Sequence, residues 1–183
     1  MFSFRRVLYR GKRIMAIHAP RKKFFIKITG DLADDREDVL EWIGQRAKEA
    51  FTVVCIGGGT RISEACAKHN IPYRFGPLGR EIENFEGTQI ARDELELNQR
   101  AMQDMLAARG IFVAVEIPVR MIASVLCHEN GDTMVKSAYH GFDTLFVLTL
   151  EGREQNKRKE FANLPKVEIV AFPRLASTSP NAL

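Results

Sequence analysis

The chain has 183 residues, of which 45% are hydrophobic and 27% are charged, and this composition predicts one globular domain with a sizeable core. No stretch approaches the ~20 apolar residues of a membrane-spanning helix, and the N-terminus has no long apolar segment of the secretory kind. Three cysteines without paired spacing favour buried free thiols over disulfides or a zinc site. We therefore expect a cytoplasmic protein with no membrane partner.

The positive charge is concentrated at the N-terminus. Residues 1–27 hold nine lysines or arginines and no acidic residue, so the rest of the chain, with 18 basic and 23 acidic residues, has a net charge of −5. A basic leader is compatible with a transit segment, or with contact to nucleic acid or a membrane surface. We prefer a terminal extension outside the fold, with Met15 as an alternative start, so nucleic acid is not an expected partner. The predicted organisation is a leader at residues 1–23, one domain over residues 24–172 and a polar tail at residues 173–183.

A strand, a helix and a second strand are predicted near the start of this domain. An apolar run at residues 24–28 ends at a turn that contains Gly30. Residues 34–50 have apolar side chains at helical spacing, with acidic side chains in the first turn, and residues 52–56 form a second apolar run. Two parallel strands joined by a crossover helix are the economical interpretation, and they predict an α/β fold.

Three glycines, Gly57, Gly58 and Gly59, follow the second strand and precede a helical pattern at residues 62–69. Glycines let the backbone approach a ligand closely, and the amides of a helix N-terminus can hold an anion. The spacing matches neither the dinucleotide fingerprint nor the P-loop, because no Gly-Lys-Ser or Gly-Lys-Thr follows. A phosphate or carboxylate site is one interpretation, and a tight turn without a ligand is the other.

The two strand ends together resemble a known family. Lys27-Ile28-Thr29-Gly30 and Val53-Val54-Cys55-Ile56-Gly57-Gly58-Gly59 look like the opening of the amino acid kinase superfamily. The resemblance implies a three-layer α/β/α sandwich with an open, mainly parallel sheet. It also implies phosphoryl transfer from ATP, with Mg²⁺ bridging the ATP phosphates, to a carboxylate, a carbamate or a nucleoside monophosphate. Lys27 would contact the transferred group, and Gly30 and the three glycines would cradle phosphate and acceptor, although Thr29 replaces a common glycine.

The middle of the chain is predicted to cover the acceptor. Residues 71–75 favour a short strand and residues 76–87 a loop or hairpin, the region that in these kinases closes over the acceptor substrate. Arg74, Arg80 and Arg92 are candidates for binding an anionic acceptor, but ordinary surface arginines are the preferred interpretation.

The longest predicted helix spans residues 90–109 and ends before Gly110. Its apolar stripe consists of Leu97, Ala101, Met105 and Ala108, widened by Met102 and Leu106. This apolar width and the family resemblance both favour a homodimer. Further strands are predicted at residues 111–115 and 122–126.

A second chemical centre is predicted in the polar turn at residues 128–133, ahead of a helical stretch at residues 135–140. Asn130-Gly131-Asp132 resembles the Asn-Ala-Asp turn of acetylglutamate kinases, whose aspartate orients the lysines around the transferred phosphoryl group. The alternative is that Asp132 or Thr133 simply caps the helix. His128 and His140 have no second ligand at metal spacing, so they are left out of the site and no metal site is predicted.

The C-terminal part is predicted to bind the nucleotide. Strands are expected at residues 144–149 and 167–172. Thr149 and Gly152 resemble the family's nucleotide-side element, one residue shorter than the common form, and Lys157 lies where a phosphate-contacting loop would follow. Acetylglutamate kinases carry a second catalytic lysine in a longer insertion that is missing here. No helix is expected in its place, and Lys157 or Lys159 is the candidate substitute.

Two functions from different classes fit these residues. One is a small ATP-dependent kinase with Lys27 and Asp132 as catalytic residues and a small-molecule acceptor. The other is a binding or regulatory protein that keeps the scaffold and has lost phosphoryl transfer, as the shortened nucleotide half suggests. Ligands in open α/β sheets bind at the carboxyl ends of the strands. The kinase hypothesis therefore predicts that Lys27 lies within direct or one-water reach of Asp132.

Overall fold

The computed structural model describes residues 21–33, 36–76 and 79–175. Most of the predicted leader and residues 176–183 of the predicted tail lie outside the described residues. Within the range predicted as leader, Lys23 belongs to the fold, because strand β1 spans Lys23–Ile28. The Lys23 carbonyl also accepts a hydrogen bond of 2.9 Å from the amide of Asp143.

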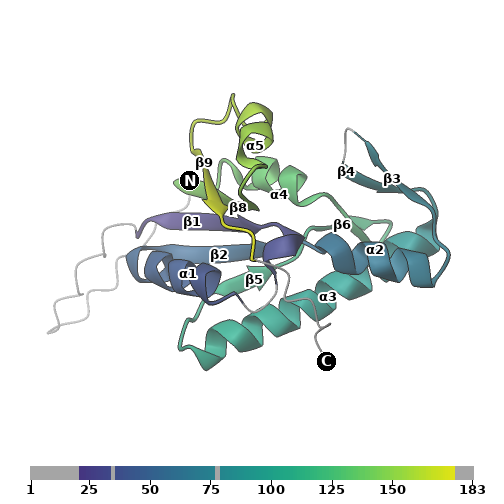
Figure 1. The fold of residues 1–183 in the computed structure, drawn as a ribbon, viewed down its shortest axis with the longest axis horizontal. Coiled ribbons are helices and arrows are strands. Elements are labelled where there is room, and N and C mark those ends of the chain that lie inside the picture. The colour runs from purple at the N-terminus through teal and green to yellow at the C-terminus, as the bar shows by residue number, and fades with distance from the viewer. Residues whose placement is uncertain (1–20, 34–35, 77–78, 176–183) are drawn as a thin grey trace, which may run out of the picture.

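A five-stranded sheet forms the centre of the described structure, with the strand order β5-β2-β1-β8-β9 (Figure 1). Every neighbouring pair in this sheet is parallel, which confirms the predicted open, parallel α/β architecture. The strands after β1 are β2 (Phe51–Ile56), β5 (Ala114–Glu116), β8 (Thr144–Leu150) and β9 (Val167–Phe172). The direction of chain progress reverses beside β1, because β2 and β8 lie on opposite sides of it. Ligands of open α/β sheets bind at such reversal points.

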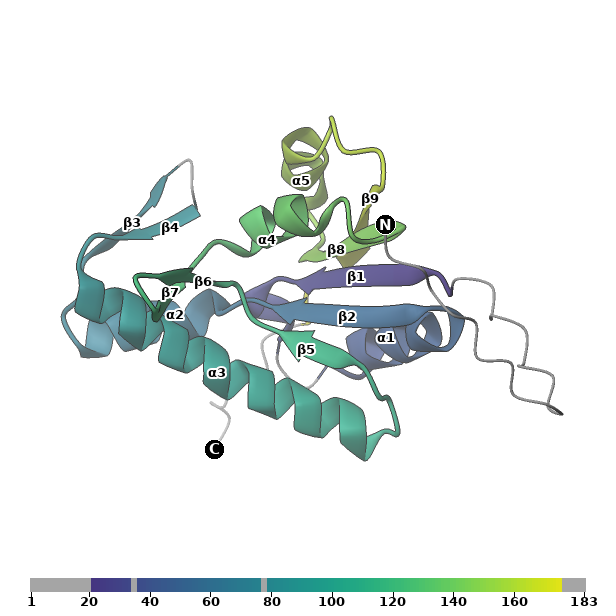
Figure 2. The same cartoon turned by 180° about the vertical axis from the view of Figure 1, so that it is seen from behind.

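Helices cover both faces of the sheet (Figures 1 and 2). Alternate residues of a strand point to opposite faces, so Ile26 and Ile28 enter the larger core. Helices α1 (Glu37–Glu49), α2 (Gly59–Lys68) and α3 (Phe85–Ala108) contribute apolar side chains to that core. Phe25 enters a smaller core, to which α4 (Gly131–Ala138) contributes Val135. Phe161, which follows helix α5 (Glu154–Glu160), packs in the same smaller core.

Two antiparallel hairpins lie outside the main sheet. Strands β3 (Tyr73–Gly76) and β4 (Gly79–Ile82) form the first, where a strand and a loop or hairpin are predicted. Strands β6 (Val119–Ile122) and β7 (Val125–His128) form the second. The predicted strand at residues 122–126 is therefore wrong, because it spans the turn of this hairpin. Ala123 and Ser124 adopt positive φ angles of 46° and 68°, which residues with a Cβ rarely do.

Two helices also differ from the prediction. The buried face of α3 consists of Gly87, Ala91, Leu95, Asn98, Met102 and Leu106. Met102 and Leu106, which widen the predicted stripe, lie on this face, but Leu97, its first member, is 48% exposed. Nothing in the structure tests the homodimer, which stays a prediction. Helix α5 occupies the segment in which only a loop is expected, because a helix with no buried residue leaves no apolar period in the sequence. No helix of the described ranges is both long and apolar enough to cross a membrane.

Candidate active site

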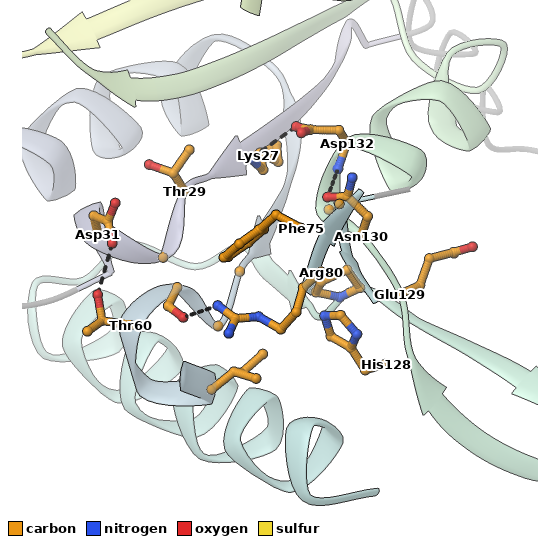
Figure 3. A pocket seen from close by; sticks show the side chains of 18 of the residues that line it. Lys27, Thr29, Asp31, Thr60, Phe75, Arg80, His128, Glu129, Asn130 and Asp132 are labelled. Carbon is orange, nitrogen blue, oxygen red and sulfur yellow. Dashed lines mark hydrogen bonds and ion pairs between the residues drawn. The ribbon is translucent and has the colours of Figure 1, made fainter. Parts of the chain in front are cut away.

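A cavity of about 490 Å³ lies at the carboxyl ends of β1 and β2 (Figure 3). The turns that follow these two strands line it, together with the first turn of α2, the β3–β4 hairpin, the β7–α4 turn and α5. Of the predicted site residues, the cavity brings together Lys27, Gly30, Gly57, Gly58, Gly59, Asp132 and Lys157. Segments that are more than a hundred residues apart in the sequence therefore meet where the topology of the sheet places a ligand site.

Two of the glycines are required by the close contact of the two strand-exit turns. A Cβ on Gly30 would lie 2.1 Å from the amide nitrogen of Gly59, so the two backbones touch directly. Gly59 has a φ of +44°, in the left-handed region that glycine adopts without steric cost. The contact brings the turn after β1 against the N-terminus of α2, so both turns face the same cavity.

The backbone of the second turn is already partly engaged. The amide of Gly57 donates a hydrogen bond of 3.1 Å to the carbonyl of Ile28 at the end of β1. Gly57 is therefore not an available donor, and an anion at this turn would depend on the amides of Gly58 and Gly59. In this respect the simple expectation that all three glycines donate to an anion is corrected.

Three charged side chains meet at one wall of the cavity. Lys27 points to the α4 side of the sheet, and its Nζ lies 3.1 Å from Oδ1 of Asp132 (Figure 3). Nζ of Lys157 donates a short hydrogen bond to the other carboxylate oxygen, Oδ2. The exposed fractions of the side chains are only 8% for Lys27 and 10% for Asp132. The prediction that Lys27 lies within direct reach of Asp132 is thus confirmed.

Asp132 does not cap α4. Asn130 is the N-cap, and its side-chain oxygen accepts a hydrogen bond of 3.2 Å from the amide of Asp132. The capping alternative for Asp132 and Thr133 is therefore wrong. Because Asn130 takes the capping role, the Asp132 carboxylate is left to pair with the two lysines.

The carboxylate of Asp132 is held in its charged form. Burial alone would raise its pKa, but the positive charges of Lys27 and Lys157 and their hydrogen bonds outweigh burial, so the pKa lies below its usual value. Burial likewise opposes the charge of Lys157, yet pairing with Asp132 and Glu160 raises the pKa of this lysine. An aspartate with a lowered pKa is a weak base, so this arrangement suits holding the two lysine side chains in place better than accepting a proton.

Arg80 and His128 also line the cavity. For Arg80, the preferred interpretation as an ordinary surface arginine is therefore wrong, and His128 was not predicted in the site. The Arg80 guanidinium donates to Oγ of Ser63 and to the carbonyl of Gly59, both at 2.7 Å, and stacks 4.6 Å from the ring centroid of Tyr73. Burial, with the positive charge of Arg80, lowers the pKa of His128 to about 4, so this imidazole is neutral at neutral pH. Arg80 and His128 lie on β4 and β7, in two different hairpins, so only the packing of these hairpins at the cavity brings the two side chains together, and no local motif encodes it.

Two predicted nucleotide-binding residues do not line this cavity. Thr149 is fully buried near the end of β8, and Gly152 lies in the following turn with a φ of +86°. Arg153, the next residue, does line the cavity and pairs at 2.5 Å with Oδ2 of Asp31, whose Oδ1 accepts from Thr60 at 3.1 Å. The end of β8 thus contacts the turn after β1 through a charged pair at the edge of the cavity.

Comparison with known proteins supports the fold. No protein-family model matches the chain, and no curated protein matches its sequence. Among solved structures, the chain is similar to smu.665 from Streptococcus mutans UA159, with a TM-score of 0.60 and 12% identity over 76% of this chain and 83% of that chain. An isopentenyl phosphate kinase aligns with a TM-score of 0.47 and 15% identity over 81% of this chain and 91% of that chain. The first likeness is one of fold alone, and the lower TM-score of the second supports no conclusion.

Proposed function

We propose that this chain is an ATP-dependent phosphotransferase whose acceptor is a small carboxylate, a carbamate or a nucleoside monophosphate. The observation that carries the proposal is the pair of lysines, Lys27 and Lys157, on the two oxygens of one buried aspartate at the wall of the cavity. Phosphoryl transfer requires cations that are already oriented towards the charge on the transferred group. Lys157 also pairs with Glu160, which Lys136 contacts at 3.6 Å, so the three lysines and two carboxylates of this network leave one net positive charge.

The chain's own residues divide the proposed work between them. Lys27 and Lys157 neutralise the oxygens of the transferred phosphoryl group, and Asp132 holds both ammonium groups in place. The amides of Gly58 and Gly59, at the N-terminus of α2, donate to phosphate oxygens. The near-complete burial of Lys27 and Asp132 weakens competition from water and strengthens these interactions.

The lining residues fit a polyphosphate. Four cationic side chains contribute to the cavity, those of Lys27, Arg80, Arg153 and Lys157. Among the described residues, no group of three or more His, Cys, Asp or Glu side chains is arranged to hold a metal ion. Mg²⁺ would enter with ATP. Besides Asp132, the carboxylates that line the cavity are those of Asp31, which pairs with Arg153, and Glu129, which pairs with Arg120. When bound, Mg²⁺ would neutralise charge on the phosphates.

Calorimetric titration with Mg-ATP, followed by an ADP-release assay against a panel of carboxylates and UMP, tests the proposal. We expect Lys27→Met and Lys157→Met to lower the transfer rate about 100-fold or more while the protein stays folded. Lys159→Met is the matched control, because Lys159 lies on the same helix but does not line the cavity. It should leave the rate unchanged.

The two functional hypotheses give different results in this assay. Binding of Mg-ATP without ADP release for any acceptor would favour the alternative, a binding or regulatory protein that has lost transfer. Neither binding nor transfer by the wild-type chain would contradict both. Loss of activity in Lys159→Met, with Lys157→Met unaffected, would show that the second lysine has been assigned to the wrong residue.

A further inference from the structure

Asn98 is an exception on the buried face of α3. Five of the six residues on this face are apolar or glycine, and Asn98 is only 2% exposed. Burying a side-chain amide costs free energy unless hydrogen bonds satisfy it. An apolar residue would fill the same position without this cost, so the partners of Asn98 indicate what the position does.

Both ends of the Asn98 amide group have partners. Its Nδ2 donates a hydrogen bond of 3.3 Å to the carbonyl of Gly57, 41 residues earlier in the chain. Its Oδ1 accepts one of 2.9 Å from the guanidinium of Arg61, in the first turn of α2. Asn98 therefore joins the middle of α3 to the glycine turn on one side and to the helix that follows this turn on the other.

The hydrogen bond to Gly57 fixes the direction of an amide in the cavity wall. A peptide unit is planar and trans, so the carbonyl of Gly57 and the amide of Gly58 point in opposite directions. With the carbonyl held towards α3, the Gly58 amide is directed away from α3. Gly58 lines the cavity, whereas Asn98 does not.

Glycine turns would otherwise leave this peptide free to rotate. Gly57 and Gly58 have no Cβ to restrict their dihedral angles. The amide of Gly57 is held by Ile28, which fixes the peptide before Gly57. Asn98 supplies the corresponding restraint on the peptide after it.

We propose that Asn98 is a positioning residue that holds the peptide between Gly57 and Gly58 in the orientation in which the Gly58 amide binds a phosphate oxygen of the ligand. This inference rests on the proposed function, because it requires a phosphate-bearing ligand in the cavity. Asn98 itself lies outside the cavity lining, so it acts through the turn.

Asn98→Asp and Asn98→Leu test the inference. Both variants remove the Nδ2 group that donates to Gly57. Asn98→Asp replaces it by a carboxylate oxygen of the same size, and Asn98→Leu replaces the side chain by an apolar one that suits the buried face of α3. The probe is the magnesium complex of a non-hydrolysable ATP analogue, titrated by calorimetry and by following the amide NMR signal of Gly58. We expect about tenfold weaker binding in both variants, because a hydrogen bond to a charged group is lost or misdirected. We also expect the shift of the Gly58 signal on binding to be reduced.

Met102→Ala is the matched control, since Met102 is fully buried on the same face of α3, about one turn further along. It should lower the thermal stability but leave the affinity and the Gly58 shift unchanged at temperatures where it is folded. A merely structural Asn98 would behave like Met102.

The outcomes separate the two proposals. If the wild type binds the analogue and Asn98→Leu binds equally well with an unchanged Gly58 shift, the positioning role is refuted and the proposed function stands. If the wild type does not bind, the proposed function fails and this inference fails with it. Asn98→Leu keeps the test decisive even if the buried carboxylate of Asn98→Asp prevents folding.

Discussion

The two faces of strand β1 differ in what they contribute. Ile26 and Ile28 point into the larger core and are completely buried among apolar side chains of α1, α2 and α3. Lys27, between them in the sequence, points to the opposite face, where it pairs with Asp132 at the start of α4. One face therefore carries most of the apolar burial, and the other gives up apolar packing to hold a charged cluster beside a cavity.

The difference teaches how a small domain accommodates buried charge. A buried ion pair contributes little net stability, because desolvation offsets the attraction between the charges. Such a cluster can be kept in a small domain only where another part of the fold supplies the stability. Here that part is the opposite face of the same strand. Substitutions that disturb the two faces should therefore have different consequences.

The largest expected effect on stability comes from the apolar face. Ile26→Ala removes a fully buried side chain from the larger core, so we expect a loss of about 3 kcal/mol in the free energy of unfolding. Urea unfolding followed by circular dichroism measures it. The protein that remains folded should bind the ligand with the affinity of the wild type. A weaker affinity of the folded fraction would contradict the division between the two faces.

A smaller loss is expected on the charged face. Asp132→Asn leaves the two lysines without their shared carboxylate, and breaking a fully buried pair costs about 3–5 kcal/mol. Because Lys157 is 20% exposed and also pairs with Glu160 at 2.8 Å, we expect about 2 kcal/mol here. Transfer activity should fall far more than stability does. Equal stability of variant and wild type would show that the cluster contributes nothing to the fold.

The sequence predicts the parallel sheet and its first two strand exits, because those strands are apolar runs and the glycines after them need no partner to be recognised. It finds Met102 and Leu106 on the buried face of α3 but misses Asn98, because Asn98 looks like a surface residue and its hydrogen-bond partners, Gly57 and Arg61, lie on other segments. Arg80 and His128 reach the cavity only through hairpin packing. Long-range polar pairing leaves no periodic signal in the sequence, so these parts of the site become visible only in the folded structure.

The pH dependence of stability should separate the charged face from the rest. The pKa of Asp132 is lower in the folded chain than its unfolded value of about 3.9, so its stabilisation is fully present above that pH. It is lost as the pH falls through the folded pKa. We therefore expect the difference in unfolding free energy between wild type and Asp132→Asn to be constant from about pH 5 to 8 and to shrink below about pH 4.

Urea unfolding midpoints of both proteins across this range give the difference directly. Other acid-sensitive pairs, such as Glu37 with Arg109, are present in both proteins and cancel in the comparison. A difference that grows as the pH falls would reverse the sign and show that the Asp132 carboxylate is destabilised in the folded state.

The smallest expected effect concerns Gly131, the first residue of α4. A Cβ at this position would lie 3.0 Å from Cε of Lys27, so the lysine would have to move by a few tenths of an ångström. Alanine in place of a helical glycine normally adds about 0.4–1 kcal/mol of stability by restricting the unfolded chain. In Gly131→Ala we expect the displaced lysine to offset this gain, so stability stays nearly unchanged while ligand affinity falls.

A double-mutant cycle with Lys27→Ala isolates this contact. With the Lys27 side chain removed, Gly131→Ala should show the full gain of about 0.4–1 kcal/mol, measured by thermal or urea unfolding. The same change in stability in both backgrounds would mean that Lys27 does not pack against Gly131. A gain that appears only without the lysine would show that glycine is kept at the start of α4 because the charged face of β1 needs the space.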